Sequence, residues 1–164
     1  MPIESATFSA IFRATAAPLV LYARQWLDRG EAEDVVQEAF IRLLEQRHMP
    51  ENARAWLFRC VRNGAISRQR AHQRRRRREQ QLAQTRSDWF LPDADAALNA
   101  AAVQDALQHL PPDQREIVVL RIWGQMTLQE IADLTGIAMS TVHRQYQSAL
   151  VQMRRAMEAP CKTT

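Results

Sequence analysis

The chain has 164 residues, a formal net charge of +4 and a sequence pI near 9.8. This length allows one ordinary domain or two small ones, and it excludes a large enzyme core. The excess positive charge favours an anionic partner. Only two cysteines occur, Cys60 and Cys161, and their wide separation excludes a redox pair and a cysteine metal cluster.

Three observations predict a cytoplasmic protein with no membrane insertion. Two distant cysteines suit a reducing compartment. No uninterrupted apolar run approaches the roughly 20 residues that a membrane span needs. The N-terminus also lacks the charged region and the apolar block of a secretion signal.

Apolar periodicity predicts helices along the first part of the chain. One helical stripe begins at Phe8, and Pro18 marks the entry to a second helix that ends at Gly30. A further helix is expected over residues 31–47, and its two faces differ. The apolar face consists of Val36, Ala39, Phe40 and Leu43. The opposite face is acidic around one apolar residue and consists of Asp34, Gln37, Glu38, Ile41 and Glu45.

Two interpretations of this acidic face remain open from periodicity alone. It is either a solvated surface with one tolerated apolar residue or a docking face. A docking face would use Ile41 as an apolar centre and the charges as a rim that meets a basic partner.

A loop and a long basic helix follow. Pro50 predicts the loop over residues 48–52, because proline disfavours helix in the residue before it. The helix over 54–78 contains ten arginines and no Asp or Glu. Its apolar stripe would hold the basic side chains in one direction, which favours a track for nucleic-acid phosphates. Phe58 is expected to be a partly buried core ring, and stacking on an unpaired base is its alternative.

Between residues 79 and 97 the apolar pattern fades, which predicts a flexible linker. Trp89, Phe90 and Leu91 interrupt it, and we expect them to pin the linker against a domain. Helices resume near Leu98, and one of them starts at Pro112, which suits a first helical turn.

Residues 127–150 predict a helix-turn-helix. Thr127 and Glu130 match a capping box, and Gly136 supplies the positive backbone angle of the turn. The expected core consists of Ile131, Leu134, Ile137, Val142, Tyr146 and Leu150. The exposed residues that would face base edges in the major groove are Ser140, Thr141, His143, Arg144 and Gln147. From this motif alone, an ordinary helical hairpin remains the alternative.

The sequence predicts no catalytic site, metal or cofactor. The histidines lack the spacing of a metal site, and neither a Gly-rich phosphate loop nor a nucleophile elbow occurs. A DNA recombinase with a terminal helix-turn-helix is the enzymatic rival, but no α/β catalytic region precedes the motif. No strand alternation stands out, so an all-α chain is expected.

Three blocks of sequence stand in one order along the chain. They are AEDVVQEAFIRLL at 32–44, AWLFRCVRNGAISRQR at 55–70, and LPPDQREIVVLRIWGQMTLQEIADLTGIAMSTVHRQYQSALVQMR at 110–154. Together they resemble the extracytoplasmic-function (ECF) group of bacterial sigma factors, in the sigma-70 family. The resemblance implies two small helical domains joined by a flexible linker. Region 2 would span 1–78, the linker 79–97, and region 4, with the helix-turn-helix, 98–158.

The resemblance also implies partners and residues. The first domain would bind the β′ clamp helices of RNA polymerase core and open the minus-ten promoter element. The second would read the minus-35 element and meet the β flap. The implied core-binding residues are Asp34, Gln37, Glu38 and Ile41. The implied minus-ten residues are His48, Asn52, Arg59, Arg62, Asn63 and Arg70, where the loop and the next helix would hold a flipped base. The implied minus-35 residues are the exposed ones of the helix-turn-helix.

The chain departs from the family pattern at several positions. Gly64 stands where a larger apolar residue is usual, and a glycine inside a helix costs about 1 kcal/mol relative to alanine. Ala138 replaces the usual serine cap, so Ser140 is expected to begin the recognition helix instead. His143 and Gln145 stand where Lys and Arg are frequent, which should weaken nonspecific binding to DNA.

The predicted function is therefore a sigma factor that directs RNA polymerase core to promoters and initiates transcription. Many relatives are held inactive by an anti-sigma factor, which makes one a candidate partner. A stand-alone helix-turn-helix transcriptional regulator is the alternative, and it would bind duplex DNA without polymerase.

Overall fold

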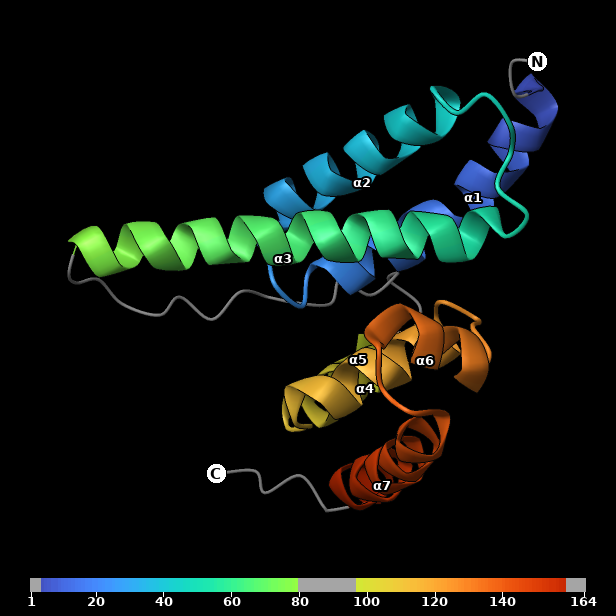
Figure 1. Ribbon diagram of the computed structural model, residues 1–164. Coiled ribbons are helices and arrows are strands. Elements are labelled where there is room, and N and C mark those ends of the chain that lie inside the picture. The colour runs from blue at the N-terminus through green and yellow to red at the C-terminus, as the bar shows by residue number, and fades with distance from the viewer. Residues whose placement is uncertain (1–3, 80–96, 159–164) are drawn as a thin grey trace. The chain divides into compact units, whose positions relative to one another are not determined.

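The computed structural model describes residues 4–79 and 97–158. Within those ranges every regular element is a helix (Figure 1). The helices are α1 (Ser5–Ala23), α2 (Arg29–Leu44), α3 (Ala53–Glu79), α4 (Ala97–Gln108), α5 (Pro112–Ile122), α6 (Leu128–Thr135) and α7 (Met139–Glu158). The chain divides into two compact units, Met1–Trp89 and Phe90–Thr164. The prediction of an all-α chain with two helical parts is confirmed.

The predicted linker lies almost wholly outside the described residues, and so do Trp89, Phe90 and Leu91. Only its two end positions are described, since α3 includes Glu79 and α4 begins at Ala97.

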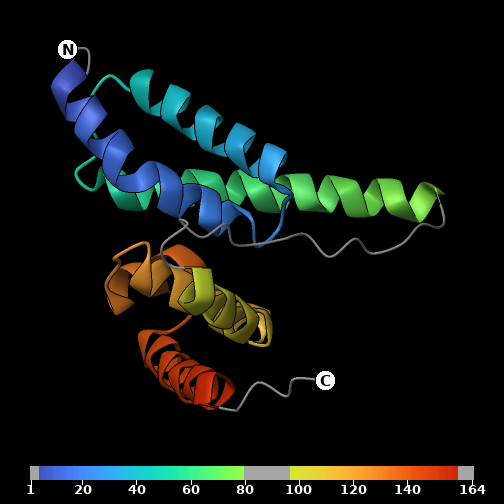
Figure 2. The ribbon, with the colours of Figure 1, turned by 180° about the vertical axis from the view of Figure 1, so that it is seen from behind.

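In the first unit, α1, α2 and α3 pack against one another in all three pairs. The fully buried side chains of this core include Leu19, Tyr22, Leu43, Leu57, Phe58 and Val61. The C-terminal turns of α3 extend beyond α1 and α2 (Figures 1 and 2). The unit therefore combines a three-helix core with a projecting helix end.

The prediction of two helices before residue 30 is wrong. Pro18 lies inside α1, which continues to Ala23. Proline removes one backbone hydrogen bond and bends a helix without necessarily ending it, and α1 changes direction along its length (Figure 2). Gly30 lies in the first turn of α2, because Asp28 caps that helix. The backbone N–H of Glu31 donates to Oδ1 of Asp28 at 2.9 Å.

α1 is long and apolar enough, by length and composition, to cross a membrane. The sequence prediction considered only uninterrupted apolar runs, and Arg13 interrupts this one. The core helix of a soluble protein passes the same test. In this unit Leu19 and Tyr22 of α1 are fully buried, and the helix packs on both of its neighbours. Part of its apolar side thus has a partner within the unit, although only 22% of its apolar stretch is buried.

The contact between α2 and α3 explains Gly64. A Cβ atom at Gly64 would lie 3.0 Å from Cγ1 of Val35, and Val35 is itself buried. A larger side chain at this position would have to push the helices apart or displace Val35. The departure from the family pattern therefore has a packing reason, namely the close approach of two helices.

In the second unit, α7 packs against α4, α5 and α6. Pro112 occupies the first turn of α5, as predicted. Arg115 of α5 ties this helix to the end of α4 with three donated hydrogen bonds. They reach the carbonyls of Leu107 at 2.9 Å, Gln108 at 3.0 Å and Leu110 at 3.1 Å. Burial lowers the pKa of Arg115 below its ordinary value.

The helix-turn-helix has the predicted local structure. The N–H of Glu130 donates to Oγ1 of Thr127 at 3.1 Å, and the N–H of Thr127 donates to Oε2 of Glu130 at 2.7 Å. Gly136 ends α6 with a φ of 75°. Both the capping box and the glycine turn are therefore confirmed.

The predicted start of the recognition helix at Ser140 is wrong. α7 begins at Met139, because the carbonyl of Ala138 accepts the N–H groups of Thr141 at 2.9 Å and Val142 at 3.0 Å. A backbone carbonyl can start a helix without a side-chain cap.

The predicted core of this motif is partly right. Ile131, Leu134 and Val142 are buried. The residues that are only half-buried are Ile137, Tyr146 and Leu150. Ala149 and Met153 take buried positions that the sequence prediction missed.

We expect Gly64→Leu to lower the free energy of unfolding by about 1 kcal/mol. Overpacking against Val35 costs roughly 1–3 kcal/mol, which exceeds the roughly 1 kcal/mol gained by removing a helical glycine. Urea unfolding followed by circular dichroism measures the change. Adding Val35→Ala should restore part of the loss, whereas an equally stable Gly64→Leu protein would contradict the close contact.

We expect Thr127→Ala to destabilise the second unit by about 1 kcal/mol, because α6 loses its side-chain cap. Thr127→Ser keeps a hydroxyl at the same place and is the matched control. The thermal unfolding midpoint should fall for the alanine variant and stay near the original value for the serine variant. Equal midpoints for both variants would show that the capping box contributes nothing measurable.

Candidate functional site

The predicted docking residues lie together on the outer side of α2. Asp34, Gln37, Glu38 and Ile41 are all exposed, and Ile41 is 49% exposed. The apolar residues of α2 face the core as predicted, with Val36, Ala39, Phe40 and Leu43 buried. This arrangement leaves the apolar side chain of Ile41 exposed to solvent among acidic and amide side chains.

An apolar groove of about 450 Å³ adjoins Ile41 between α1 and α2. Phe12 and Leu44 line it and are 46% and 50% exposed. The ring centroid of Phe12 lies 4.9 Å from that of Phe40. The exposed apolar area is therefore wider than the predicted docking face, whose only apolar residue was Ile41. The sequence contained a signal for this wider area, because Phe8 and Phe12 stand one helical turn apart and therefore share one face of their helix.

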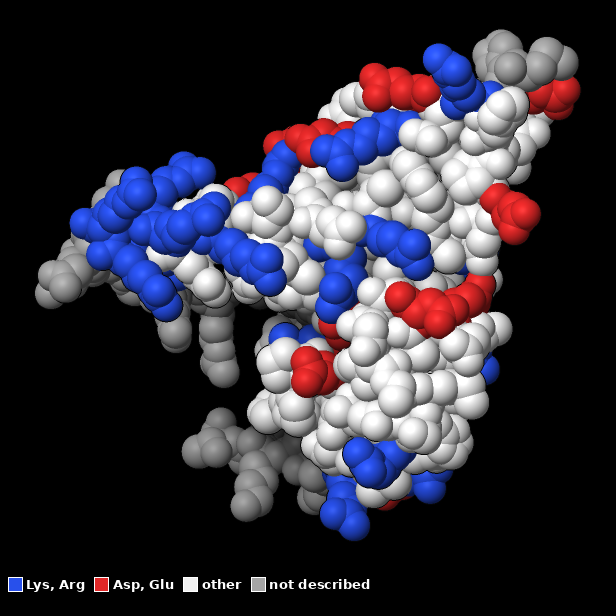
Figure 3. Space-filling view, in the orientation of Figure 1, with Lys and Arg blue, Asp and Glu red and all other residues white. Residues whose placement is uncertain are grey.

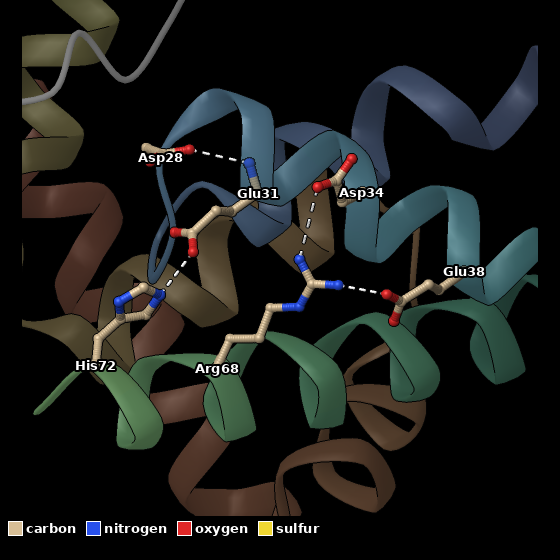
Figure 4. Close-up of polar contacts among 6 residues, drawn as sticks. All are labelled: Asp28, Glu31, Asp34, Glu38, Arg68 and His72. Carbon is tan, nitrogen blue, oxygen red and sulfur yellow. Dashed lines mark hydrogen bonds and ion pairs between the residues drawn. The ribbon is translucent and has the colours of Figure 1, made fainter. Parts of the chain in front are cut away.

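The acidic residues of α2 have partners on α3 that the sequence prediction missed (Figure 4). The guanidinium of Arg68 lies between two carboxylates. Its Nη2 donates to Oε1 of Glu38, and its Nη1 lies 3.9 Å from Oδ2 of Asp34. One turn further along, Nε2 of His72 lies 2.6 Å from Oε1 of Glu31. Two acidic residues of the predicted docking face, Asp34 and Glu38, are thus already paired with Arg68 of the same chain.

The predicted loop leads into α3. Residues 48–52 lie between α2 and α3, and both His48 and Asn52 are exposed. Oδ1 of Asn52 accepts a hydrogen bond from the N–H of Ala55 at 2.9 Å. Asn52 therefore caps the basic helix, a structural role that accompanies the predicted contact with DNA.

The basic face of α3 lies on the side away from the core. Arg59, Asn63 and Arg70 are exposed, and Arg62 is half-buried. Further along, Arg74 to Arg78 are all exposed, and Figure 3 shows the basic side chains gathered over the C-terminal end of this helix.

Stacking of Phe58 on a base is wrong for this structure. The ring is fully buried, and its centroid lies 5.3 Å from that of Tyr22. Phe58 follows Leu57 in the helix and shares its buried side, so the ring completes the core where α3 meets α1.

The predicted base-reading residues share one side of the recognition helix α7. Ser140, His143, Arg144 and Gln147 are exposed, while Thr141 is half-buried at the edge of this face. Spacings of three and four residues place the exposed ones in a row along the helix.

Among the described residues, no group of three or more His, Cys, Asp or Glu side chains could hold a metal ion. His72 is engaged by Glu31, and Nδ1 of His109 lies 2.7 Å from the carbonyl oxygen of Asp105. Burial raises the pKa of the Cys60 thiol, which favours the unreactive protonated form.

Sequence families match both units. The family described as Sigma-70 region 2 matches residues 11–75, and the family described as Sigma-70, region 4, matches residues 100–153. These matches cover the three helices of the first unit in large part and the helix-turn-helix of the second.

Curated relatives extend the likeness along nearly the whole chain. The ECF RNA polymerase sigma factor SigL of Mycobacterium tuberculosis is 30% identical over 161 residues, which cover 94% of this chain and 91% of SigL. The RNA polymerase sigma-E factor of Streptomyces coelicolor is 30% identical over 161 residues, covering 95% of this chain and 89% of that protein. The ECF sigma factor SigX of Bacillus subtilis is 29% identical over 141 residues, covering 80% and 73%.

Solved structures share the fold. The sigma factor RpoE in its complex with the anti-sigma factor NepR from Bartonella quintana aligns with a TM-score of 0.77 at 20% identity, covering 96% of this chain and 99% of RpoE. CnrH in complex with the cytosolic domain of CnrY aligns with a TM-score of 0.61 at 22% identity, covering 96% and 91%. With two sigma-70 regions in order and a 30% identical relative along almost its full length, the chain belongs to the ECF group of the sigma-70 family of RNA polymerase sigma factors.

Proposed function

We propose that the protein is a promoter-specificity subunit, which directs bacterial RNA polymerase core to specific promoters and initiates transcription. The observation that carries this function is the order of two helical units that match sigma-70 regions 2 and 4. A stand-alone regulator would account for the helix-turn-helix, but it leaves the first unit without a role.

The α2 face suits the clamp helices of the β′ subunit. Ile41 and the adjoining groove supply an apolar centre, and Asp34 and Glu38 supply an acidic rim. A partner helix with apolar residues and Lys or Arg would match both features. Gln37 would add neutral hydrogen bonds on the same face.

The loop and α3 suit DNA at the minus-ten element. Exposed arginines of α3 would bind phosphates, and each phosphate that is neutralised adds close to one unit to the salt dependence of binding. His48 and Asn63 would lie near a base flipped out of the non-template strand. Capture of that base offsets its lost stacking, a cost of a few kcal/mol. Promoter opening of this kind requires no catalytic residue, so the protein would not be an enzyme.

The face of α7 suits duplex DNA at the minus-35 element. The polar side chains of this face, including the guanidinium of Arg144, would read base edges by hydrogen bonds. Contact between the second unit and the β flap would share the binding with the first unit. Such a chain would act in the cytoplasm, with region 2 over 1–78 and region 4 over 98–158. An anti-sigma factor is a candidate partner, since both solved relatives are bound to one or to a cytosolic domain.

Run-off transcription with purified bacterial core enzyme tests this function. We expect a promoter-dependent transcript only when the protein and the core are both present. A gel-shift with and without core separates the two candidate functions. Tight binding to a duplex operator by the protein alone, with no transcript from added core, would favour a stand-alone regulator.

Charge reversal on α2 should abolish docking. We expect Asp34→Lys with Glu38→Lys to weaken core binding at least tenfold, because like charges facing a basic surface cost several kcal/mol. Fluorescence titration of labelled protein with core measures the affinity, and circular dichroism checks the fold. Glu4→Lys, at the exposed start of α1, is the control and should bind as before. Unchanged affinity of the double variant would remove the docking assignment.

Arg144→Ala should impair reading of the minus-35 element. Loss of one base contact costs about 1–3 kcal/mol of sequence discrimination. Run-off transcription from paired promoters, one intact and one with a scrambled minus-35 element, measures this preference. We expect the preference to fall while DNA binding with core persists. Arg154→Ala, nearly three turns along the same helix, should leave the preference intact, and an unaffected preference in Arg144→Ala would contradict the assigned face.

A further inference from the structure

The core-facing side of α3 changes from apolar to polar along its length. Leu57 and Val61 are fully buried on this side, and Gly64 packs on Val35. Spacings of three and four residues then bring Arg68 and, after it, His72 to the same side. This side of α3 carries core residues in its first half. In its second half it presents the guanidinium of Arg68 and the imidazole of His72 to α2.

Arg68 meets two of the acidic residues on the predicted docking face. Its guanidinium bridges Glu38 and Asp34 (Figure 4). The Arg68 side chain is 29% exposed, whereas those of Glu38 and Asp34 are 49% and 66% exposed. The cation is thus drawn toward the interior while both carboxylates stay accessible to an incoming partner.

We propose that Arg68 is an internal counter-ion of the docking face, which competes with the cations of RNA polymerase core for Glu38 and Asp34 and lowers the affinity for core. This inference rests on the proposed function of the α2 face. Arg68 partly neutralises the two carboxylates before docking, so the field that attracts a basic partner is weaker than the sequence of α2 suggests. A cation of the partner must either displace Arg68 or share the carboxylates with it.

The exposure of the carboxylates sets the size of this competition. Ion pairs in contact with water change an equilibrium constant by a factor of about five at most, because water and salt screen them. Displacement of Arg68 is therefore feasible during docking, and the residue adjusts affinity without blocking the site.

Arg68 does not share the basic face of α3. Arg59 stands nine residues before it, which is half a turn away around the helix at about 100° per residue, and Arg70 lies nearly as far round. Both are exposed on the outer side. Removal of Arg68 should therefore change docking without removing a phosphate contact from the outer face.

The packing of α2 on α3 has other supports besides Arg68. Val35 packs on Gly64, and His72 pairs with Glu31. These contacts lie on either side of Arg68 along α3. The fold should therefore tolerate the loss of the guanidinium.

The test compares core binding by variants of the full chain. We expect Arg68→Gln to raise the affinity for core about two- to fivefold at low salt, in line with the worth of an exposed ion pair. The gain should shrink as salt is raised. Arg68→Lys keeps the charge and should stay near the original affinity. Arg68→Met, which keeps the apolar stem, should reproduce the gain if Arg68→Gln folds poorly.

The matched control is Arg29→Gln. Arg29 forms an exposed ion pair with Glu33 on α2, with Nε 2.9 Å from Oε1, and this pair does not include Glu38 or Asp34. We expect no comparable gain from this variant. In a background of Asp34→Asn with Glu38→Gln, the gain from Arg68→Gln should vanish, because the carboxylates it competes for are gone.

Two failures can be told apart. If the original protein does not bind core, the proposed function fails. If it binds core, and charge reversal of Asp34 and Glu38 weakens that binding, while Arg68→Gln and Arg68→Met leave it unchanged or weaker, the counter-ion role alone is overturned. Weaker binding in that case would mean that Arg68 positions the carboxylates for the partner.

Discussion

The close approach of α2 and α3 at Val35 and Gly64 is the constraint on which the first unit depends. α2 turns its acidic and apolar face outward on one side, and α3 turns its arginines outward on another. Both faces are useful to a sigma factor only if their relative position is fixed. A close contact that leaves little room for a Cβ atom at Gly64 fixes it, because tightly packed helices cannot slide without losing contacts. The polar contacts of Arg68 and His72 with carboxylates of α2 then continue the same interface into the solvent.

Local features could be predicted from the sequence because their causes lie a few residues apart. The capping box of Thr127 and Glu130 and the turn at Gly136 depend on neighbours within one turn. The two faces of α2 follow from helical periodicity alone. The helical periodicity indicated the all-α class, and the ordered blocks of sequence then identified the family and its two domains.

Other features depend on how helices meet, which periodicity does not specify. Nothing near Arg68 in the sequence indicates that α2 will bring Glu38 to it. Burial of Phe58 depends on where Tyr22 of α1 lies. Nothing near Arg115 in the sequence indicates that this side chain will donate to three carbonyl groups at the end of α4 and in the turn after it. The sequence prediction began a new helix at Pro18. In the folded unit, the packing of α1 on α2 and α3 offsets the hydrogen bond that this proline removes.

The projecting end of α3 has a consequence for how this helix responds to its surroundings. Five successive arginines, Arg74 to Arg78, are exposed there, where α1 and α2 no longer reach (Figures 1 and 2). Their charges repel one another, while the dipole at a helix C-terminus favours cations. The helical state of this end is therefore a balance between two electrostatic effects of similar size. Dissolved salt screens both effects, whereas a strand of phosphates would neutralise the arginines and relieve the repulsion, so we expect the helical content of this end to respond to its ionic environment.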